Sequence, residues 1–433
     1  MPTSALLQLV AKGRQDVYLT GEPQFTFFKH VYRRHQRFAI ESIPIEWDGT
    51  PNWGQRLSCL IPRKAELLSQ MFLEIDLPPL PQQDFGDGNG LQNVYWVNDI
   101  GHVLIEDISI EIGEKEIDKH VGQWLHIWDE LTVPPGVKSG YNTMIGHFDN
   151  YPPMGPVGLS LSIPLRFWFC RSIGAALPLI ALQAHPIRII MHLAPFQKLW
   201  YASYIFGGDG YGTSGPAVQP CPTIPPVPPS RIQLFGDYIY LDTDERRMFA
   251  AREHEYLITQ LQISPVQSIP IGQQNVVVPL YFNNCCTEMV WVVQQTSAQI
   301  TREWFNFSSG IPSLGGVSQS DLLSSAILRL DGYDRFQARN AAYFRLTQPY
   351  QRHTNIPTGP DGKSKFIYLY SFALKPEDEQ PSGTLNCSKI DNITWTLTMD
   401  PGQLTMERQV YFYAVNYNIL RIVGGLGGVA FIA

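Results

Sequence analysis

The stretch "RLSCLI" (residues 56–61) carries an apolar side chain at every second position, and this pattern returns 219 residues later as "NVVVPL" (275–280). Alternation of this kind is typical of a strand with one buried face. Recurrence at a long fixed offset predicts two copies of one β domain. Under the shift, the apolar set Leu57, Cys59 and Ile61 falls on Val276, Val278 and Leu280.

The same shift also relates other segments of the chain. It places Phe72 and Leu73 on Trp291 and Val292, Gly113 and Ile117 on Gly332 and Phe336, and Trp124 and Leu125 on Tyr343 and Phe344. Farther on the offset falls to about 205, which pairs 165–169 with the FIYLYSF region and 187–193 with 393–399. It then falls to near 177, which pairs 232–241 with 409–418. One segment does not keep phase: Ile108, Ile110 and Ile112 are out of step with Ala326, Leu328 and Leu330.

Strand patterns dominate the rest of the chain. Aromatic and β-branched runs of five to nine residues recur between Gly, Pro and Asn/Asp clusters, among them 25–32, 71–77, 105–112, 159–169, 288–294 and 366–374. Helical patterns are confined to 119–131, 245–257 and 336–346, with Thr243 as the expected N-cap of the second. These patterns predict an all-β fold of two tandem eight-stranded jelly-roll sandwiches, with a few short helices in loops and linker.

The expected domain organisation has four parts. An N-terminal arm covers residues 1–24, a first jelly roll 25–244, a linker 245–256 and a second jelly roll 257–433. The first jelly roll contains a Gly/Pro-rich stretch over 195–230, including "GGDGYGTSGP" and "CPTIPPVPPS". Because such residues form packed strands poorly, this stretch is interpreted as a protruding functional loop.

The amino-acid composition limits the classes of function that the chain can have. Charged residues make up 16% of the 433 residues, against about 25% in typical domains. A surface buried against other chains and a β-rich fold with polar strands both explain this. The formal net charge of -7 predicts no direct nucleic-acid binding. No apolar run is long enough to span a membrane, no secretory signal is recognised, and the six cysteines show no metal-binding spacing.

Enzyme signatures are missing from the sequence: it has no G-x-S-x-G, no P-loop, no H-E-x-x-H and no Rossmann glycine motif. The carboxylates Glu111, Glu114, Glu116 and Asp118 surround Gly113 and are interpreted as a solvated hairpin tip. His30, His35 and the run 253–255 lack the H-x-H pattern of a metal-binding jelly roll. We therefore expect no catalytic residue, metal or cofactor. Trp168, Trp291 and Trp395 lie in apolar runs, which favours core packing over sugar stacking.

The N-terminal segment carries a resemblance. The run from Leu6 to Ile43 resembles the N-terminal signature of the major capsid proteins of nucleocytoplasmic large DNA viruses. Further similar stretches occur in order at 110–120, 176–185, 237–250, 254–262, 368–392 and 416–428. Val423 and Leu426 stand where the family often has Met. The matching signature residues are Gln15, Asp16, Leu19, Thr20, Gly21, Pro23, Thr26, Phe27, Phe28, Lys29, Tyr32, Arg33 and Arg34.

This resemblance implies a structural major capsid protein in a virion. Its double jelly-roll subunits would form homotrimeric, pseudo-hexagonal capsomers that tile the outer icosahedral shell, with assembly in the host cytoplasm. Expected partners are neighbouring capsomers and minor capsid proteins beneath the shell. The alternatives are a paralogous minor capsid or scaffold subunit of the same fold, a jelly-roll carbohydrate-binding protein, and a two-domain glycosidase.

Several expectations concern the surface. Residues 5–10 are expected to dock on neighbouring protein inside the shell, or else on an internal membrane. The stretch 25–32 should enter the first sandwich as a strand, with Arg33, Arg34 and Arg37 at its end. By analogy the 195–230 loop faces the host, where it would bind glycans. Asn306, Asn386 and Asn392 meet the spacing rule for N-glycosylation, and the sequence leaves open whether they carry sugar.

Overall fold

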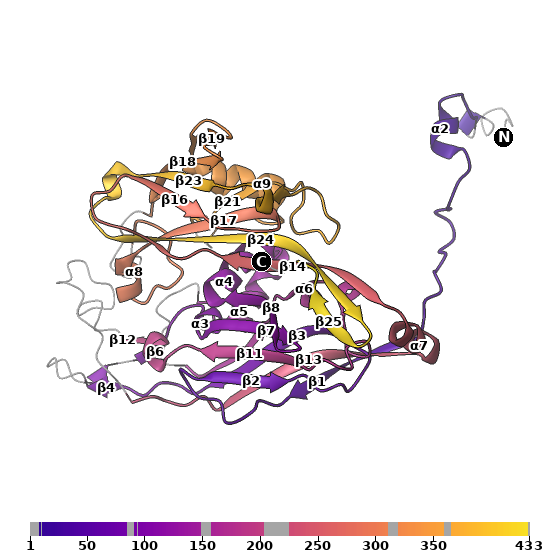
Figure 1. The fold of residues 1–433 in the computed structure, drawn as a ribbon, viewed down its shortest axis with the longest axis horizontal. Coiled ribbons are helices and arrows are strands. Elements are labelled where there is room, and N and C mark those ends of the chain that lie inside the picture. Colours follow the sequence, from indigo (N-terminus) through magenta and orange to yellow (C-terminus); the bar gives the residue numbers. More distant parts are fainter. Residues whose placement is uncertain are drawn as a thin grey trace. The chain divides into compact units, whose positions relative to one another are not determined.

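The structure, a computed structural model, describes residues 8–9, 11–84, 91–92, 94–148, 157–202, 225–310, 319–358 and 365–431. It divides into two units, Met1–Phe38 and Ala39–Ala433. The first unit contains the short helix α2 (Asp16–Thr20), and the second contains nearly all of the sheet structure (Figure 1). None of the helices in the described ranges combines the length and apolar character needed to cross a bilayer.

The first half of the large unit is built on two antiparallel sheets. One has the order β1 (Phe38–Ile45), β13 (Arg231–Leu241), β3 (Leu67–Leu77), β10 (Leu177–Pro178), and β9 (Leu159–Pro164) also pairs with β3. The other has the order β2 (Arg56–Leu60), β11 (Ile187–Leu193), β7 (Ile105–Ile112), β8 (Lys115–Val121). Two small pairs accompany them: β12 (Trp200–Ala202) with β6 (Val94–Trp96), and β4 (Gln83–Asp84) with β5 (Leu91–Gln92).

The second half repeats this plan. Its first sheet has the order β14 (His254–Ile263), β24 (Arg408–Val423), β17 (Cys285–Gln295), β21 (Tyr368–Ser371), joined by β15 (Gln267–Ile269), β22 (Leu385–Asn386) and β25 (Leu426–Val429). Its second sheet has the order β16 (Asn275–Leu280), β23 (Ile393–Met399), β18 (Leu323–Leu330), β19 (Tyr333–Asp334), with β20 (Arg339–Asn340) beside β18. Trp291 and Trp395 meet between the two sheets, with ring centroids 4.5 Å apart.

Helices are few, as expected, but their bounds differ from the prediction. The α-helices described in the large unit are α3 (Ile100–Val103), α4 (Gly122–Thr132), α5 (Pro135–Ile145), α6 (Trp168–Arg171), α7 (Thr243–Ala251), α8 (Thr296–Ile300) and α9 (Gln348–Arg352), with a π-helical turn over Tyr343–Thr347. Residues 119–121 of the first predicted region are strand rather than helix, and helix in the third predicted region begins only at residue 341. The strand expected over 159–169 ends at Pro164 and gives way to α6.

The N-cap of helix α7 lies one residue before the predicted one. Asp242 is the N-cap, because its carboxylate accepts a hydrogen bond from the Glu245 amide at 2.9 Å. Thr243 is therefore the first helical residue, and the expectation that it caps the helix is wrong. Asp244 and Glu245 lie in the first turn, where the helix dipole favours negative charge.

The pairing registers confirm the duplication and correct its offset. Leu73 pairs with Leu234 in the first half, and Trp291 pairs with Phe412 in the second. Trp291 lies 218 positions after Leu73, and Phe412 lies 178 positions after Leu234. All four side chains are buried. Phe72 instead lies half-buried on the outer face of its sheet, so its predicted equivalence with Trp291 is wrong by one residue.

A local irregularity supports the corrected offset. The Ser69 hydroxyl donates to the Asp237 carbonyl at 3.3 Å, and the Thr287 hydroxyl donates to the Val415 carbonyl at 3.1 Å, again 218 and 178 positions on. Both residues lie where the strand register shifts by one. The offset of 218 also restores the phase of β7 against β18, whose burial patterns then agree, with Ile110 on Leu328.

The hairpins that follow β7 and β18 have the same kind of turn. Gly113 and Glu114 have φ of 60° and 65°, and Asp331 and Gly332 have φ of 51° and 82°. Two successive residues with positive φ are typical of the tight turns that match the twist of paired strands. Gly113 therefore corresponds to Asp331 rather than to Gly332.

The helix α4 joins the two halves through their cores. Trp124, Ile127, Trp128 and Leu131 belong to the hydrophobic cluster of the second half, whereas Leu125 belongs to that of the first. The Trp124 ring lies 5.3 Å from that of Tyr413. In return, Ile258, Leu420 and Ile422 of the second half pack in the first core. Figure 1 shows α4 between the two pairs of sheets.

Backbone and side-chain hydrogen bonds also join the two halves along the contact between them, which we call the seam. The Leu261 amide donates to Asp118 Oδ1 at 3.0 Å, and the Ala184 amide donates to the Gly425 carbonyl at 3.0 Å. A Cβ on Gly427 would lie 2.4 Å from Leu182 Cδ2, so a larger residue where β25 approaches the first half would have to displace the Leu182 side chain. The two sandwiches are thus held in one compact unit.

We predict that Trp124→Ala lowers the free energy of unfolding by about 3–5 kcal/mol, because it opens a cavity where the two cores meet. The matched control is Val137→Ala on α5, whose side chain is exposed and which should change stability by less than about 0.5 kcal/mol. Urea denaturation followed by circular dichroism measures both. A Trp124→Ala variant as stable as the control would contradict the role of α4.

Candidate assembly surfaces

The signature residues at 15–21 build a short, locally hydrogen-bonded turn. Gln15 precedes α2, and the Gly13 amide donates to Asp16 Oδ2 at 2.6 Å. The Thr20 hydroxyl donates to the Asp16 carbonyl at 2.8 Å. A Cβ on Gly21 would lie 2.5 Å from the Val17 carbonyl oxygen, which accepts the Gly21 amide at 2.9 Å. The backbone closes on itself here only with glycine.

The strand predicted over 25–32 is not present, which corrects the expected start of the first sandwich. Residues 21–37 contain no strand or helix, and the first strand, β1, begins at Phe38. Phe27 and Phe28 are 88% and 97% exposed. An alternating aromatic pattern forms a strand only where a sheet edge and a buried face receive it, and the described residues of the arm provide neither.

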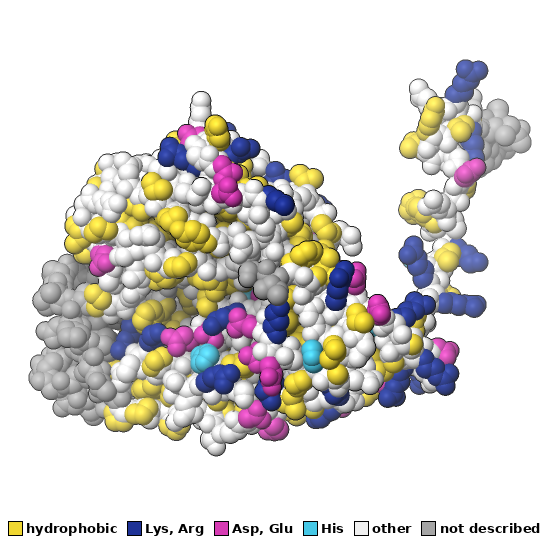
Figure 2. Space-filling view, in the orientation of Figure 1, with side chains coloured by type: hydrophobic (Ala, Val, Ile, Leu, Met, Phe, Trp, Pro, Cys, Tyr) yellow, Lys and Arg dark blue, Asp and Glu magenta, His cyan; other side chains and the backbone are white. Residues whose placement is uncertain are grey.

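The arm is both apolar and basic. All of its described residues are exposed except Asp16, which is half-buried, and they include Pro23 and Lys29. Residues 1–38 carry six Lys/Arg and two Asp/Glu, a formal charge of +4 in a chain of -7, so residues 39–433 carry -11. Within the described residues, Arg33 and Arg34 form no ion pair. Figure 2 shows dark blue and yellow side chains together along the arm.

The carboxylates around Gly113 differ in their exposure to solvent. Glu114 lies in the β7–β8 turn and is exposed, as the hairpin-tip interpretation predicts. Partial desolvation raises the pKa of the exposed Glu116 despite the opposing charge of Lys119. Asp118, by contrast, is buried: it lies 3.1 Å from His120 Nε2 and accepts the Leu261 amide across the seam. The Asp118 carboxylate therefore helps to hold the two halves together.

The residues considered for metal or sugar binding have structural contacts. His254 Nε2 lies 2.7 Å from the Phe249 carbonyl, and Glu255 pairs with Arg421 at 2.7 Å. His30 and His35 lie in the exposed arm. In the described ranges no three His, Cys, Asp or Glu side chains are grouped to hold a metal ion. The predicted core positions of Trp168, Trp291 and Trp395 are confirmed by their burial.

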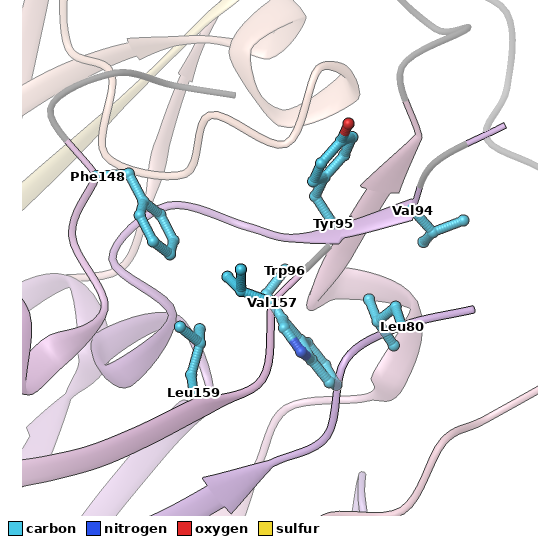
Figure 3. Close-up of a pocket in the computed structure, with 7 residues that line it drawn as sticks. All are labelled: Leu80, Val94, Tyr95, Trp96, Phe148, Val157 and Leu159. Atoms are coloured by element: carbon cyan, nitrogen blue, oxygen red, sulfur yellow. The ribbon is translucent and has the colours of Figure 1, made fainter. Parts of the chain in front are cut away.

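One apolar hollow lies beside the small β6–β12 pair (Figure 3). The Trp96 indole in its wall donates to the Pro78 carbonyl at 2.9 Å. The wall contains no carboxylate, histidine or cysteine, and so offers little for acid–base or nucleophilic chemistry. The lining residues are Leu80, Val94, Tyr95, Trp96, Phe148, Val157 and Leu159.

A buried ionic triad in the second half has no signal in the sequence, because its members are far apart along the chain. His353 Nε2 lies 2.8 Å from Glu288 Oε2, and its Nδ1 lies 2.8 Å from Glu377 Oε1. The His353 and Glu288 side chains are fully buried. Burial alone would lower the pKa of His353, but the two carboxylates outweigh it and raise the pKa to about 9.

The three sequons differ in their surroundings. The Asn306 amide donates to Glu303 Oε2 at 2.7 Å and to the Gly310 carbonyl at 2.8 Å. Asn386 and Asn392 are exposed in the second half. The predicted 195–230 loop lies mostly outside the described residues. At its start, β12 places Trp200 and Tyr201 in the first core, so the expectation that the whole stretch is loop is wrong there.

Comparison with known proteins decides the family. Residues 26–242 match the family described as "Major capsid protein N-terminus", and residues 245–428 match "Large eukaryotic DNA virus major capsid protein". The chain belongs to the major capsid proteins of large eukaryotic DNA viruses. It is 39% identical to the major capsid protein of Pyramimonas orientalis virus, with 98% of each chain covered. It is 34% identical to that of Paramecium bursaria Chlorella virus 1, covering 98% of this chain and 99% of the relative.

Solved structures confirm the predicted double jelly roll. The "PBCV-1 virus capsid, quasi-atomic model" superposes with a TM-score of 0.75 at 29% identity, covering 94% of this chain and all of the other. The Faustovirus major capsid protein has a TM-score of 0.72 at 13% identity, with 97% of this chain and 96% of that one covered, and supports the fold alone. The chain is thus a structural component of a virus capsid, as the N-terminal signature implied.

We predict a loss of stability in alkali that depends on His353. Its folded-state pKa of about 9 lies above the ordinary value of about 6.5. Its contribution, on the order of 3 kcal/mol, is therefore complete below pH 6.5 and is lost as pH rises through 9. The measurement is the free energy of unfolding at pH 7 and pH 9.5.

His353→Gln should be less stable than the parent at pH 7 and should lose less between the two pH values. His35→Gln, in the exposed arm, should behave like the parent. Equal pH slopes in the parent and in His353→Gln would refute the assignment.

Proposed function

We propose that this chain is the repeating subunit of an icosahedral shell and that it assembles as homotrimers. Three chains bring six sandwiches together, which gives a nearly hexagonal capsomer with true threefold symmetry. The observation that carries this proposal is the agreement of strand registers between the halves, such as Leu73–Leu234 with Trp291–Phe412. Two sandwiches with the same pairing can occupy alternate positions in one ring. The shell would enclose a large double-stranded DNA genome.

We propose the four-part division of arm, first jelly roll, linker 245–256 and second jelly roll 257–433, with one change. Because residues 25–37 form no strand, the arm is extended from residue 24 to residue 37. The linker contains most of α7, which begins two residues before it at Thr243. The separate family matches to 26–242 and 245–428 support a boundary near this helix.

We propose that the signature residues of the arm act in assembly on the inner side of the shell. Exposed phenylalanines beside a formal charge of +4 favour an acidic protein partner, which fits a minor capsid protein or an adjacent capsomer. An internal anionic membrane is the second candidate, because aromatic and basic side chains also suit a lipid surface.

The chain would act without catalysis or cofactor. Assembly would take place in the host cytoplasm, and outer loops would meet host glycans.

The mass of the purified chain in solution tests the subunit proposal. Three chains of 49.0 kDa give 147 kDa, and light scattering after gel filtration should report that mass at micromolar concentration. A stable 49.0 kDa monomer would contradict the proposal and favour a carbohydrate-binding protein.

Deletion of residues 1–12 and the double variant Phe27→Ser/Phe28→Ser test the arm. Both should abolish shell assembly, seen by electron microscopy, while the unfolding midpoint stays unchanged because the described residues of the arm are almost all exposed. Tyr333→Ser, at an exposed turn of the second half, is the matched control and should assemble normally. Intact trimers and shells from both arm variants would refute the docking role. Co-flotation of the parent, but not the variants, with anionic vesicles would favour the membrane.

A further inference from the structure

The helix α4 presents two faces to two different partners. Leu125 and Asp129 face the first half, where Leu125 joins its core and Asp129 pairs with Arg166 at 2.7 Å. The opposite face packs in the second half and is completely covered. Its members are Trp124, Ile127, Trp128 and Leu131. The helix therefore attaches one sandwich to the next through a defined apolar stripe.

The second half contains the equivalent helix. In the strands that lead into the helices, Val121 pairs with Asp107 and Asn340 pairs with Ser325, so the offset at this point is 219. Helix begins at residue 341, 219 positions after Gly122. Leu125 and Asp129 then correspond to Phe344 and Gln348, and both of these are buried in their own half. The inner faces of the two helices match.

The outer faces match in position but not in burial. Under the same offset the covered stripe of α4 corresponds to Tyr343, Leu346, Thr347 and Tyr350. Tyr343 is half-buried and Thr347 is exposed, whereas Leu346 is 36% and Tyr350 77% exposed. The stripe that joins the first sandwich to the second is thus present on the second sandwich, where the described residues leave most of it exposed.

The surface that receives α4 is also duplicated. Tyr413 contacts Trp124 there, and its hydroxyl donates to Gln123 Oε1 at 2.5 Å. Val290 lies on the same outer face, because the next residue, Trp291, points into the core between the sheets. Under the offsets of 218 and 178, Val290 and Tyr413 correspond to Phe72 and Phe235.

Phe72 and Phe235 form a cross-strand pair on the outer face of the β13–β3 sheet. Pro164 pairs with Phe72 from β9. All three are half-buried, whereas the equivalents Val290 and Tyr413 are fully covered. One helix stripe and one sheet face of the chain therefore cover each other. A further stripe and a further face, their equivalents, are left partly exposed by the described residues.

We propose that the open stripe of one chain packs on the open face of the next, with Tyr343, Leu346 and Tyr350 lying against Phe72 and Phe235 of the neighbouring copy. The occupant is a second copy of this chain, because the open surfaces are equivalents of two surfaces that already bind each other. Such a head-to-tail contact is heterologous, and it closes into a ring when the same step is repeated. This inference rests on the proposed trimer and assigns its interface.

The double variant Leu346→Asp/Tyr350→Asp tests the interface, because two carboxylates cannot be buried against the phenylalanine pair without large cost. It should run as a folded 49.0 kDa monomer where the parent gives 147 kDa. Tyr281→Asp/Tyr333→Asp removes two tyrosines that are 80% and 74% exposed elsewhere on the second half, and should stay trimeric. If the parent is a monomer, the proposed trimer fails and this interface with it. A trimeric parent together with a trimeric double variant overturns the interface alone.

A measurement on the unaltered protein covers the case in which the double variant does not fold. Acetylation of the parent trimer by N-acetylimidazole, followed by peptide mass spectrometry, should modify Tyr350 at least about tenfold more slowly than Tyr281 and Tyr333. In the single chain Tyr350 is as open as these two, so protection would come from a neighbouring copy. Equal reactivity of the three tyrosines in the trimer would overturn the proposal.

Discussion

The burial of one helix face between two sandwiches is the constraint on which this structure depends. Trp124, Trp128 and Leu131 come from the first half of the chain, yet they lie in the core of the second. Neither sandwich can bury all of its apolar surface without the other. The seam is also polar and specific, since Asp118 accepts a hydrogen bond across it from the Leu261 amide. The angle between the two halves is therefore fixed by packing rather than by the linker.

The sequence predicts the duplication well and its phase less well. Alternating apolar residues identify most strands, and the offset of 219 is correct for Leu57 and for Trp124. It fails by one at β3, where Ser69 and Thr287 lie at irregular positions in the ladder. A shift of one residue turns every side chain of a strand to the opposite face. Pairing registers show this shift, but a list of apolar positions does not.

The surface is harder to predict than the core. The aromatic run at 25–32 has a strand pattern, but it forms a strand only if a sheet edge is available, and the large unit begins its sheets with β1 at Phe38. The Glu288–His353–Glu377 triad could not be found from spacing, because its members meet only after folding. Conversely, Gly21 belongs to a recognisable signature, and its close approach to the Val17 carbonyl gives that signature a physical reason.

A low share of charged residues and a duplicated, self-complementary seam both suit a subunit that is surrounded by copies of itself. The central physical claim is that the two jelly rolls form one cooperative unit through α4. Native-state hydrogen exchange tests it most directly, by comparing the free energy of opening of amides in β3 and β17. We predict values that agree within about 1 kcal/mol, because neither core opens alone. Amides of one strand that exchange through an opening several kcal/mol easier, while the other strand stays protected, would contradict the account.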